Sequence, residues 1–166
     1  FGNRCATCHG SDAGGGRGYP NLTDGAWLYG GAPETIVQTI TYGRNGMMPP
    51  FAPVLGGDAG VENVTEYVLS LSDREHDAGK AATGKELFMA ICSACHMRDG
   101  RGNPAMGAPD LTDDDWLHGG RRSDIQRALV EGIISQMPAH GDFLAPERIH
   151  LVAAYVYSLS AEQRRE

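Results

Sequence analysis

The hydrophobic positions of the chain predict two amphipathic helices, one near the middle and one near the end. Both stretches place apolar residues at the spacing of three and four that aligns them on one helical face. These residues are Val61, Val64, Val68 and Leu71 in the first stretch, and Ile149, Val152, Val156 and Leu159 in the second. Because the two sets correspond position by position, the pattern predicts the same terminal helix twice.

Two further helices are indicated by residues that are typical of helix starts and helix ends. One is predicted from Pro33, which suits a first helical position, to Gly43, and its counterpart runs from the capping candidate Ser123 to Gly132. A third helix in each half is expected to end at a cysteine motif. Gly-rich and Pro-rich loops join these helices without the alternation of a strand, so the predicted fold class is all-α.

The correspondence extends over most of the chain, as in an internal repeat. The segment NLTDGAWLYGG at residues 21–31 reappears as DLTDDDWLHGG at residues 110–120. We therefore predict two tandem domains, residues 1–75 and 76–166, with the boundary in the polar stretch SDREHDAGK. Phe1 matches Phe88, which follows the helical pattern GKEL, so we expect the first domain to lack its opening turn.

Composition narrows the class of protein. The chain has 21 acidic and 14 basic residues, and the basic ones are scattered rather than clustered, which excludes a nucleic-acid-binding surface of the usual kind. No apolar run is long enough to cross a bilayer, and no signal peptide precedes Phe1, so processing or truncation upstream is expected. Each half is too small to form a sizeable core of side chains, so we expect a covalent cross-link or a bound cofactor to stabilise it.

The four cysteines indicate how each half is stabilised. Cys5, Cys8 and His9 form the pattern C-x-x-C-H, which recurs as Cys92, Cys95 and His96. This is the pattern of c-type haem attachment. On a helix the three residues share one face, so two thioethers can hold a porphyrin edge while the imidazole reaches the iron. A redox-active cysteine pair lacks its usual βαβ context, and a shared zinc site is disfavoured because each half repeats the whole motif.

The sixth iron ligand decides between electron transfer and chemistry on a small molecule. Met48 and Met137 each precede a proline in equivalent loops, and we predict that they ligate the two irons. Met47 has no counterpart and is expected to pack in the core. The remaining methionines are expected to be core filler, and the remaining histidines are expected to lie at the surface or beside a haem propionate. They are Met89, Met97 and Met106 in the first group, and His76, His118, His140 and His150 in the second.

Residues around the ligands also repeat. Pro20 and Pro109 lie in matching G-x-P-x-L patterns, and their carbonyls are predicted to accept a hydrogen bond from the ligating histidines. Trp27 and Trp116 each carry one N–H group. Donation to a haem propionate and plain packing of the indole ring are equally good interpretations.

Together the motifs resemble class I cytochromes c over nearly the whole chain. More narrowly, PNLTDGAWLYGG, GRNGMMP and GAPDLTDDDWLHGG are similar to the dihaem subunit of cbb3-type cytochrome c oxidases. The resemblance implies two covalent haem c groups, a membrane anchor upstream, and a place on the periplasmic side of the bacterial inner membrane. It also implies that electrons pass from a cytochrome c or a cytochrome bc complex to the oxidase, whose catalytic and monohaem subunits are the expected partners. Oxygen would be reduced in the catalytic subunit, not in this chain.

Two alternatives remain open at this level. The chain is a free periplasmic dihaem shuttle if no anchor precedes it, and an enzyme acting on a sulfur compound or peroxide would require an open iron. The ligand sets are open as well. Short loops favour local pairing of His9 with Met48 and of His96 with Met137, whereas the resemblance implies that the two methionines are exchanged.

Overall fold

The structure is a computed structural model that describes residues 1–163, with side chains described through residue 160. It divides into two compact units that do not follow the two halves of the sequence. Unit 1 holds Phe1–Asn45 together with the described residues from Ser135 onward, and unit 2 holds Gly46–Ile134. This division differs from the predicted boundary near residue 75. Each unit is therefore built from both halves of the repeat.

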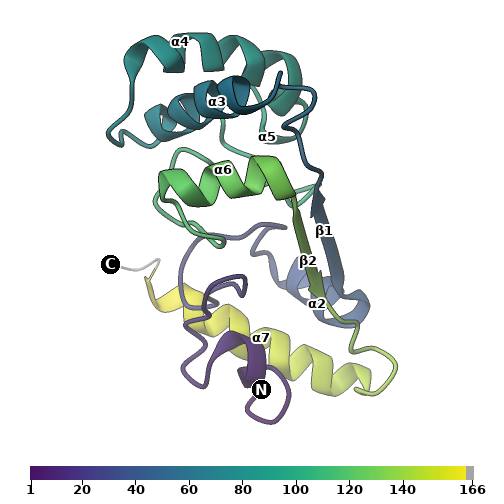
Figure 1. The fold of residues 1–166 in the computed structure, drawn as a ribbon. Coiled ribbons are helices and arrows are strands. Elements are labelled where there is room, and N and C mark those ends of the chain that lie inside the picture. Colours follow the sequence, from purple (N-terminus) through teal and green to yellow (C-terminus); the bar gives the residue numbers. More distant parts are fainter. Residues whose placement is uncertain (164–166) are drawn as a thin grey trace. The chain divides into compact units, whose positions relative to one another are not determined.

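Unit 1 contains three of the helices in Figure 1. They are α1 (Ala6–His9), α2 (Pro33–Tyr42) and α7 (Pro146–Gln163). Helices α2 and α7 pack against each other around a small core. That core consists of Ile36, Ile40, Ile149, Ala153 and Val156. The terminal helix of the second half thus covers the apolar face of the first half's middle helix.

Unit 2 contains the remaining helices. They are α3 (Asp58–Leu71), α4 (Ala78–Leu87), the π-helical turn η1 (Phe88–Cys92), α5 (Ser93–His96) and α6 (Arg122–Glu131). Helix α3 packs against both α4 and α6, and Figure 1 draws these three helices together. Their core is centred on Val64 and Phe88, which are 0% and 1% exposed. Here the terminal helix of the first half completes the second half.

The described residues are mostly helical, as the predicted all-α class requires, but two short strands were not expected. They are β1 (Arg44–Met48) and β2 (Ile133–Met137), and they pair into a two-stranded sheet. Each begins just after a glycine of positive φ, Gly43 at 70° and Gly132 at 75°. The strands run antiparallel, since Gly43 lies against Met137 and Gly132 lies against Met48. Five residues are too few for the alternation to stand out in the sequence.

The helix predictions are largely confirmed. Helix α2 begins at Pro33 and ends before Gly43 as predicted, and α6 begins one residue before Ser123. The polar stretch expected to be a linker is partly helical, because the Asp77 carboxylate accepts a hydrogen bond of 2.9 Å from the Lys80 N–H group and caps α4. Among the described residues, no helix has the length and apolarity that a membrane span requires.

Candidate haem-attachment sites

Both cysteine motifs lie on single helical turns. In the first, the His9 N–H group donates to the Cys5 carbonyl at 2.9 Å. The turn before the second motif is widened, because the Ser93 N–H group donates to the Phe88 carbonyl; before the first motif the Phe1 carbonyl accepts from Cys5 at 2.9 Å and from Ala6 at 3.4 Å. Such π-type widening is frequent at functional sites. Two cysteines and a histidine consequently share one face in each motif.

The two histidine rings are held in the same orientation. His9 Nδ1 lies 2.9 Å from the Pro20 carbonyl oxygen, and His96 Nδ1 lies 3.1 Å from that of Pro109. A carbonyl oxygen can only accept, so Nδ1 carries the proton and Nε2 keeps the lone pair that a metal needs. The predicted role of the two prolines is confirmed.

Two equivalent glycines allow this arrangement, and the sequence analysis did not single them out. The Gly15 N–H group donates to the His9 carbonyl at 2.8 Å, and the Gly102 N–H group donates to that of His96 at 3.0 Å. Both glycines have positive φ, at 70° and 76°. A Cβ atom at Gly102 would lie 2.4 Å from the Ala108 carbonyl oxygen. Only glycine lets the chain return this closely beneath the histidine.

The two predicted methionine ligands lie in different units from their own halves' motifs. Met48 packs against the core of unit 2, as do Cys92 and Trp116. Met137 packs against the core of unit 1, as do Leu22 and Trp27. The structure therefore groups Met48 with the motif of the second half and Met137 with that of the first.

Met47 was wrongly predicted to pack in the core. Its side chain is 77% exposed, because successive residues of β1 point to opposite faces and Met48 takes the inner one. Met97 and Met106 are also exposed, at 39% and 55%, whereas Met89 packs against the core of unit 2 as expected.

His140 was wrongly predicted to be a surface residue. It is 8% exposed, its Nδ1 lies 2.8 Å from the Pro138 carbonyl oxygen, and its ring packs against Phe143. The loop after Met137 folds back onto α2, where the His140 N–H group donates to the Ile40 carbonyl. His76 and His150 are exposed as predicted, and His118 is half-buried.

The two equivalent tryptophans differ in their polar contacts. Trp116 Nε1 donates to the Asp113 carbonyl at 3.0 Å. Trp27 Nε1 is buried without a hydrogen-bond partner in the described part of the chain. A buried donor of this kind calls for an acceptor. A haem propionate would supply one, so the residues around the first motif fit this cofactor.

The charge states of the motif residues also suit haem attachment. Burial lowers the pKa of His96, against the opposing effect of the Pro109 carbonyl, and so favours the neutral imidazole that ligates iron. Burial, with a contribution from Cys95, raises the pKa of Cys92 to about 11, the opposite of a redox-active thiol. Within the described residues, no three Cys, His, Asp or Glu side chains gather as a metal cluster would require.

Comparison with known proteins agrees with this geometry. The family model described as "Cytochrome C oxidase, cbb3-type, subunit III" matches residues 1–68 and 79–156. The cbb3-type cytochrome c oxidase subunit CcoP of Rubrivivax gelatinosus is 51% identical over 160 residues, which cover 96% of this chain and 52% of the relative.

Two further relatives show the same coverage. The subunit FixP of Azorhizobium caulinodans is 40% identical over 98% of this chain and 58% of its own length. The subunit CcoP of Cereibacter sphaeroides is 40% identical over 96% of this chain and 58% of its own length. The chain thus spans somewhat more than half the length of these curated relatives. On the family match and these identities, the chain belongs to the family of subunit III of cbb3-type cytochrome c oxidases.

Proposed function

We propose that this chain is the dihaem electron-transfer part of a cbb3-type oxidase subunit. One haem c is attached through Cys5 and Cys8 with His9 on its iron, and the other through Cys92 and Cys95 with His96. The observation that carries the proposal is the matched pair of histidines. Each presents a free Nε2 beside two cysteines, with Nδ1 within 3.1 Å of a proline carbonyl oxygen.

The ligand sets in this proposal are exchanged between the halves. Haem 1 is held by His9 and Met137, and haem 2 by His96 and Met48. The support is the packing of each methionine, since Met48 shares a core with Cys92 and Met137 shares one with Trp27. Local pairing would require each methionine to leave the core that now half-buries it.

The residues around each site bind, orient and desolvate the cofactor. Once bound, haem c supplies a one-electron couple at its iron, and a thioether ligand favours the reduced state. Leu22 and Leu111 contribute to the half-buried apolar rim of the two cores and keep water away. The Trp27 N–H group is available to a propionate. With both irons fully ligated, the chain transfers electrons and does not bind oxygen.

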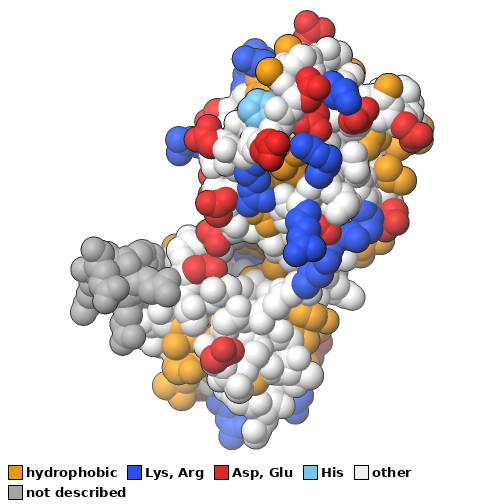
Figure 2. Space-filling model, turned by 60° about the vertical axis from the view of Figure 1, so that its left-hand side comes forward, with side chains coloured by type: hydrophobic (Ala, Val, Ile, Leu, Met, Phe, Trp, Pro, Cys, Tyr) orange, Lys and Arg blue, Asp and Glu red, His pale blue; other side chains and the backbone are white. Residues whose placement is uncertain are grey.

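The net charge of the chain bears on its electron donor. The formal charge is −7, and in the view of Figure 2 both acidic and basic side chains lie on the surface of unit 2. A negative surface attracts a basic donor such as a cytochrome c. The donor in this proposal is a cytochrome c or a cytochrome bc complex on the periplasmic side of the inner membrane, and the acceptor is the oxidase's catalytic subunit.

Purification from the native membrane tests this function. The tagged chain should carry two haems by pyridine haemochrome assay and should bring with it a haem–copper subunit and a monohaem cytochrome. One haem per chain would contradict the dihaem assignment. Recovery of a dihaem protein from the soluble fraction, free of oxidase subunits, would instead identify a periplasmic shuttle.

A further inference from the structure

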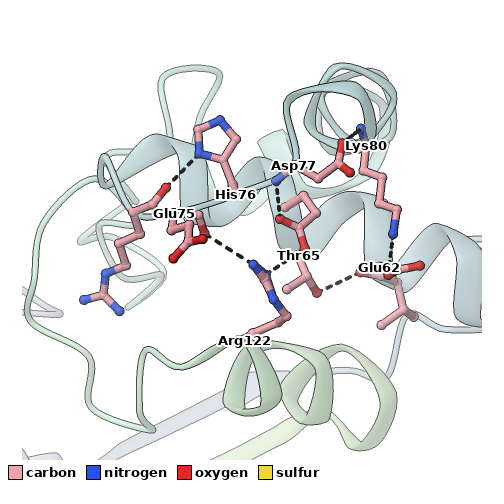
Figure 3. Close-up of polar contacts among 10 residues, drawn as sticks. Glu62, Thr65, Glu75, His76, Asp77, Lys80 and Arg122 are labelled. Carbon is pink, nitrogen blue, oxygen red and sulfur yellow. Dashed lines mark hydrogen bonds and ion pairs between the residues drawn. The ribbon is translucent and has the colours of Figure 1, made fainter.

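Unit 2 contains an ion pair whose equivalent positions in unit 1 are Ala154 and Pro33, which cannot form one. Glu66 lies in the middle of α3, and its Oε1 accepts a hydrogen bond of 2.7 Å from Arg122 Nη1. Figure 3 shows Arg122 reaching from the start of α6 toward α3 and the segment that joins the two halves of the chain. The pair connects a helix of the first half of the sequence to a helix of the second.

The carboxylate of Glu66 depends on this partner. Its side chain is 5% exposed, while that of Arg122 is 43% exposed. The second oxygen, Oε2, accepts a hydrogen bond of 2.8 Å from the Asp77 N–H group. A buried carboxylate that loses its cation is left uncompensated, which is far more costly than the loss of a surface pair. The packing of α3 in unit 2 is therefore coupled to Arg122.

Arg122 occupies a helix position that is unfavourable for a cation. It is the first residue of α6, where the helix dipole disfavours a cation. Glu66 offsets this cost. Arg122 Nη2 also donates to the Glu75 carbonyl at 3.3 Å, so the same side chain holds the segment between the halves.

The repeat shows what each helix would meet in the opposite pairing. In the alignment of the two halves, Ala154 of α7 corresponds to Glu66, and Pro33 and Glu34 of α2 correspond to Arg122 and Ser123. If α3 packed on α2, Glu66 would face a residue without charge or N–H group and a second carboxylate. If α7 packed on α6, Arg122 would face an alanine. The charges thus favour packing of α3 on α6 and oppose packing of α3 on α2.

We propose that the Glu66–Arg122 pair selects the exchanged arrangement, directing α3 onto α6 instead of α2 and so bringing Met48 to the haem of His96. Both side chains are positioning residues, because they touch neither haem. The inference rests on the proposed exchange of ligands and adds its cause. If the ion pair makes this selection, neutralising its charges should allow Met48 to ligate the haem of its own half.

The test uses the full, haem-loaded, reduced chain labelled with ¹³C at the methionine methyl groups. A methionine that ligates an iron would bring its methyl group close to that porphyrin, so the nuclear Overhauser contacts of this methyl group would identify the haem that it ligates. In the unaltered chain Met48 should contact the haem bound to Cys92. Contact with the haem of Cys5 in the unaltered chain would contradict the proposed ligand sets themselves, independently of the ion pair.

Charge variants then test the selection. Arg122→Glu places a like charge against Glu66 and should produce a second set of axial methyl signals, with Met48 on the haem of Cys5. The double variant Glu66→Gln/Arg122→Glu removes the like-charge repulsion and keeps an acceptor for the Asp77 N–H group, so it should diminish the second set. If Arg122→Glu does not accumulate as holoprotein, Arg122→Gln provides the same comparison with a milder change.

The pair Lys80–Glu62 provides the control. It joins α3 to α4 at 2.6 Å, but its side chains are 42% and 47% exposed, so solvent can compensate the loss of either charge. Glu62→Gln, which leaves Lys80 and its attraction to Glu66 in place, should leave the parent signals unchanged. The proposal is overturned if Arg122→Glu and Arg122→Gln both retain the parent ligand set alone, or if the double variant Glu66→Gln/Arg122→Glu is as altered as Arg122→Glu.

Discussion

At the scale of single residues, both haem motifs are followed by the same backbone turn, but the residue at that turn differs. The chain reverses at Gly10, with φ 80° and ψ 155°, and at the equivalent Met97, with φ 61° and ψ 165°. This region of backbone space is almost restricted to glycine, and a larger residue there costs about 1–3 kcal/mol. The second motif therefore carries strain that the first does not.

Replacing Met97 by glycine should relieve this strain. We expect Met97→Gly to raise the free energy of unfolding of the haem-loaded chain by about 1 kcal/mol, because the relief exceeds the entropic cost of a glycine. Urea denaturation followed at the haem absorbance measures the change. The matched substitution Gly10→Ala should act in the opposite direction, since its Cβ atom would also meet the Asp12 carboxylate. Equal stability of Met97→Gly and the parent would contradict this account.

Single-residue predictions from the sequence succeed where the chemistry is local. The C-x-x-C-H spacing and the G-x-P-x-L pattern specify His9 and its acceptor Pro20 without knowledge of the fold. They fail for Met47 and His140, whose burial depends on which face of β1 turns inward and on a loop that folds back onto α2. Such facts are set by tertiary packing, which a residue's neighbours in sequence do not encode.

At the scale of elements, helix α4 crosses α3 closely at Gly84. A Cβ atom at this position would lie 1.9 Å from the Asn63 carbonyl oxygen. Gly84→Ala must therefore push the helices apart, and overpacking of this kind costs about 1–3 kcal/mol. Thermal unfolding of the haem-loaded chain should show a clearly lowered midpoint.

The same helix supplies the control. At Gly79 a Cβ atom would meet only the Asp77 side chain, at 3.3 Å. Gly79→Ala should be neutral or stabilising by up to about 1 kcal/mol, because alanine favours the helix. If the two variants behave alike, the close crossing at Gly84 does not limit the packing of α3 and α4.

Element boundaries could be predicted from the sequence, but element partners could not. Pro33, Gly43 and Gly132 mark the ends of α2 and α6 because capping and positive φ act locally. The apolar faces of α3 and α7 are nearly identical repeats, so their periodicity does not state which half covers which face. Glu66 does not state it either, because it lies two residues from Val64 and from Val68, off the apolar face, where the sequence indicates a surface carboxylate.

At the scale of the whole molecule, each unit depends on both halves of the chain. Residues 1–72 supply α2 to unit 1 and α3 to unit 2, and the later residues supply α7 and α6 to the same units. Covalent continuity between the halves should therefore not be needed once the protein has folded.

Cutting the chain between the halves tests this dependence. With a protease site inserted between Ser72 and Asp73, the two haem-containing fragments should elute together after cleavage, because each completes a core of the other. They should separate only in denaturant. An uncut sample of the same variant controls for the insertion. Two fragments that separate in buffer as folded haem proteins would contradict the division into units.

The central claim is that Met48 serves the haem of the second motif and Met137 that of the first. Its most direct measurement is the nuclear Overhauser contact between each ¹³C-labelled axial methyl group and the haem beneath it, in the reduced, full-length holoprotein. The account predicts contacts from Met48 to the haem bound to Cys92 and Cys95, and from Met137 to the haem bound to Cys5 and Cys8. Contacts of each methionine with the haem of its own half would contradict it.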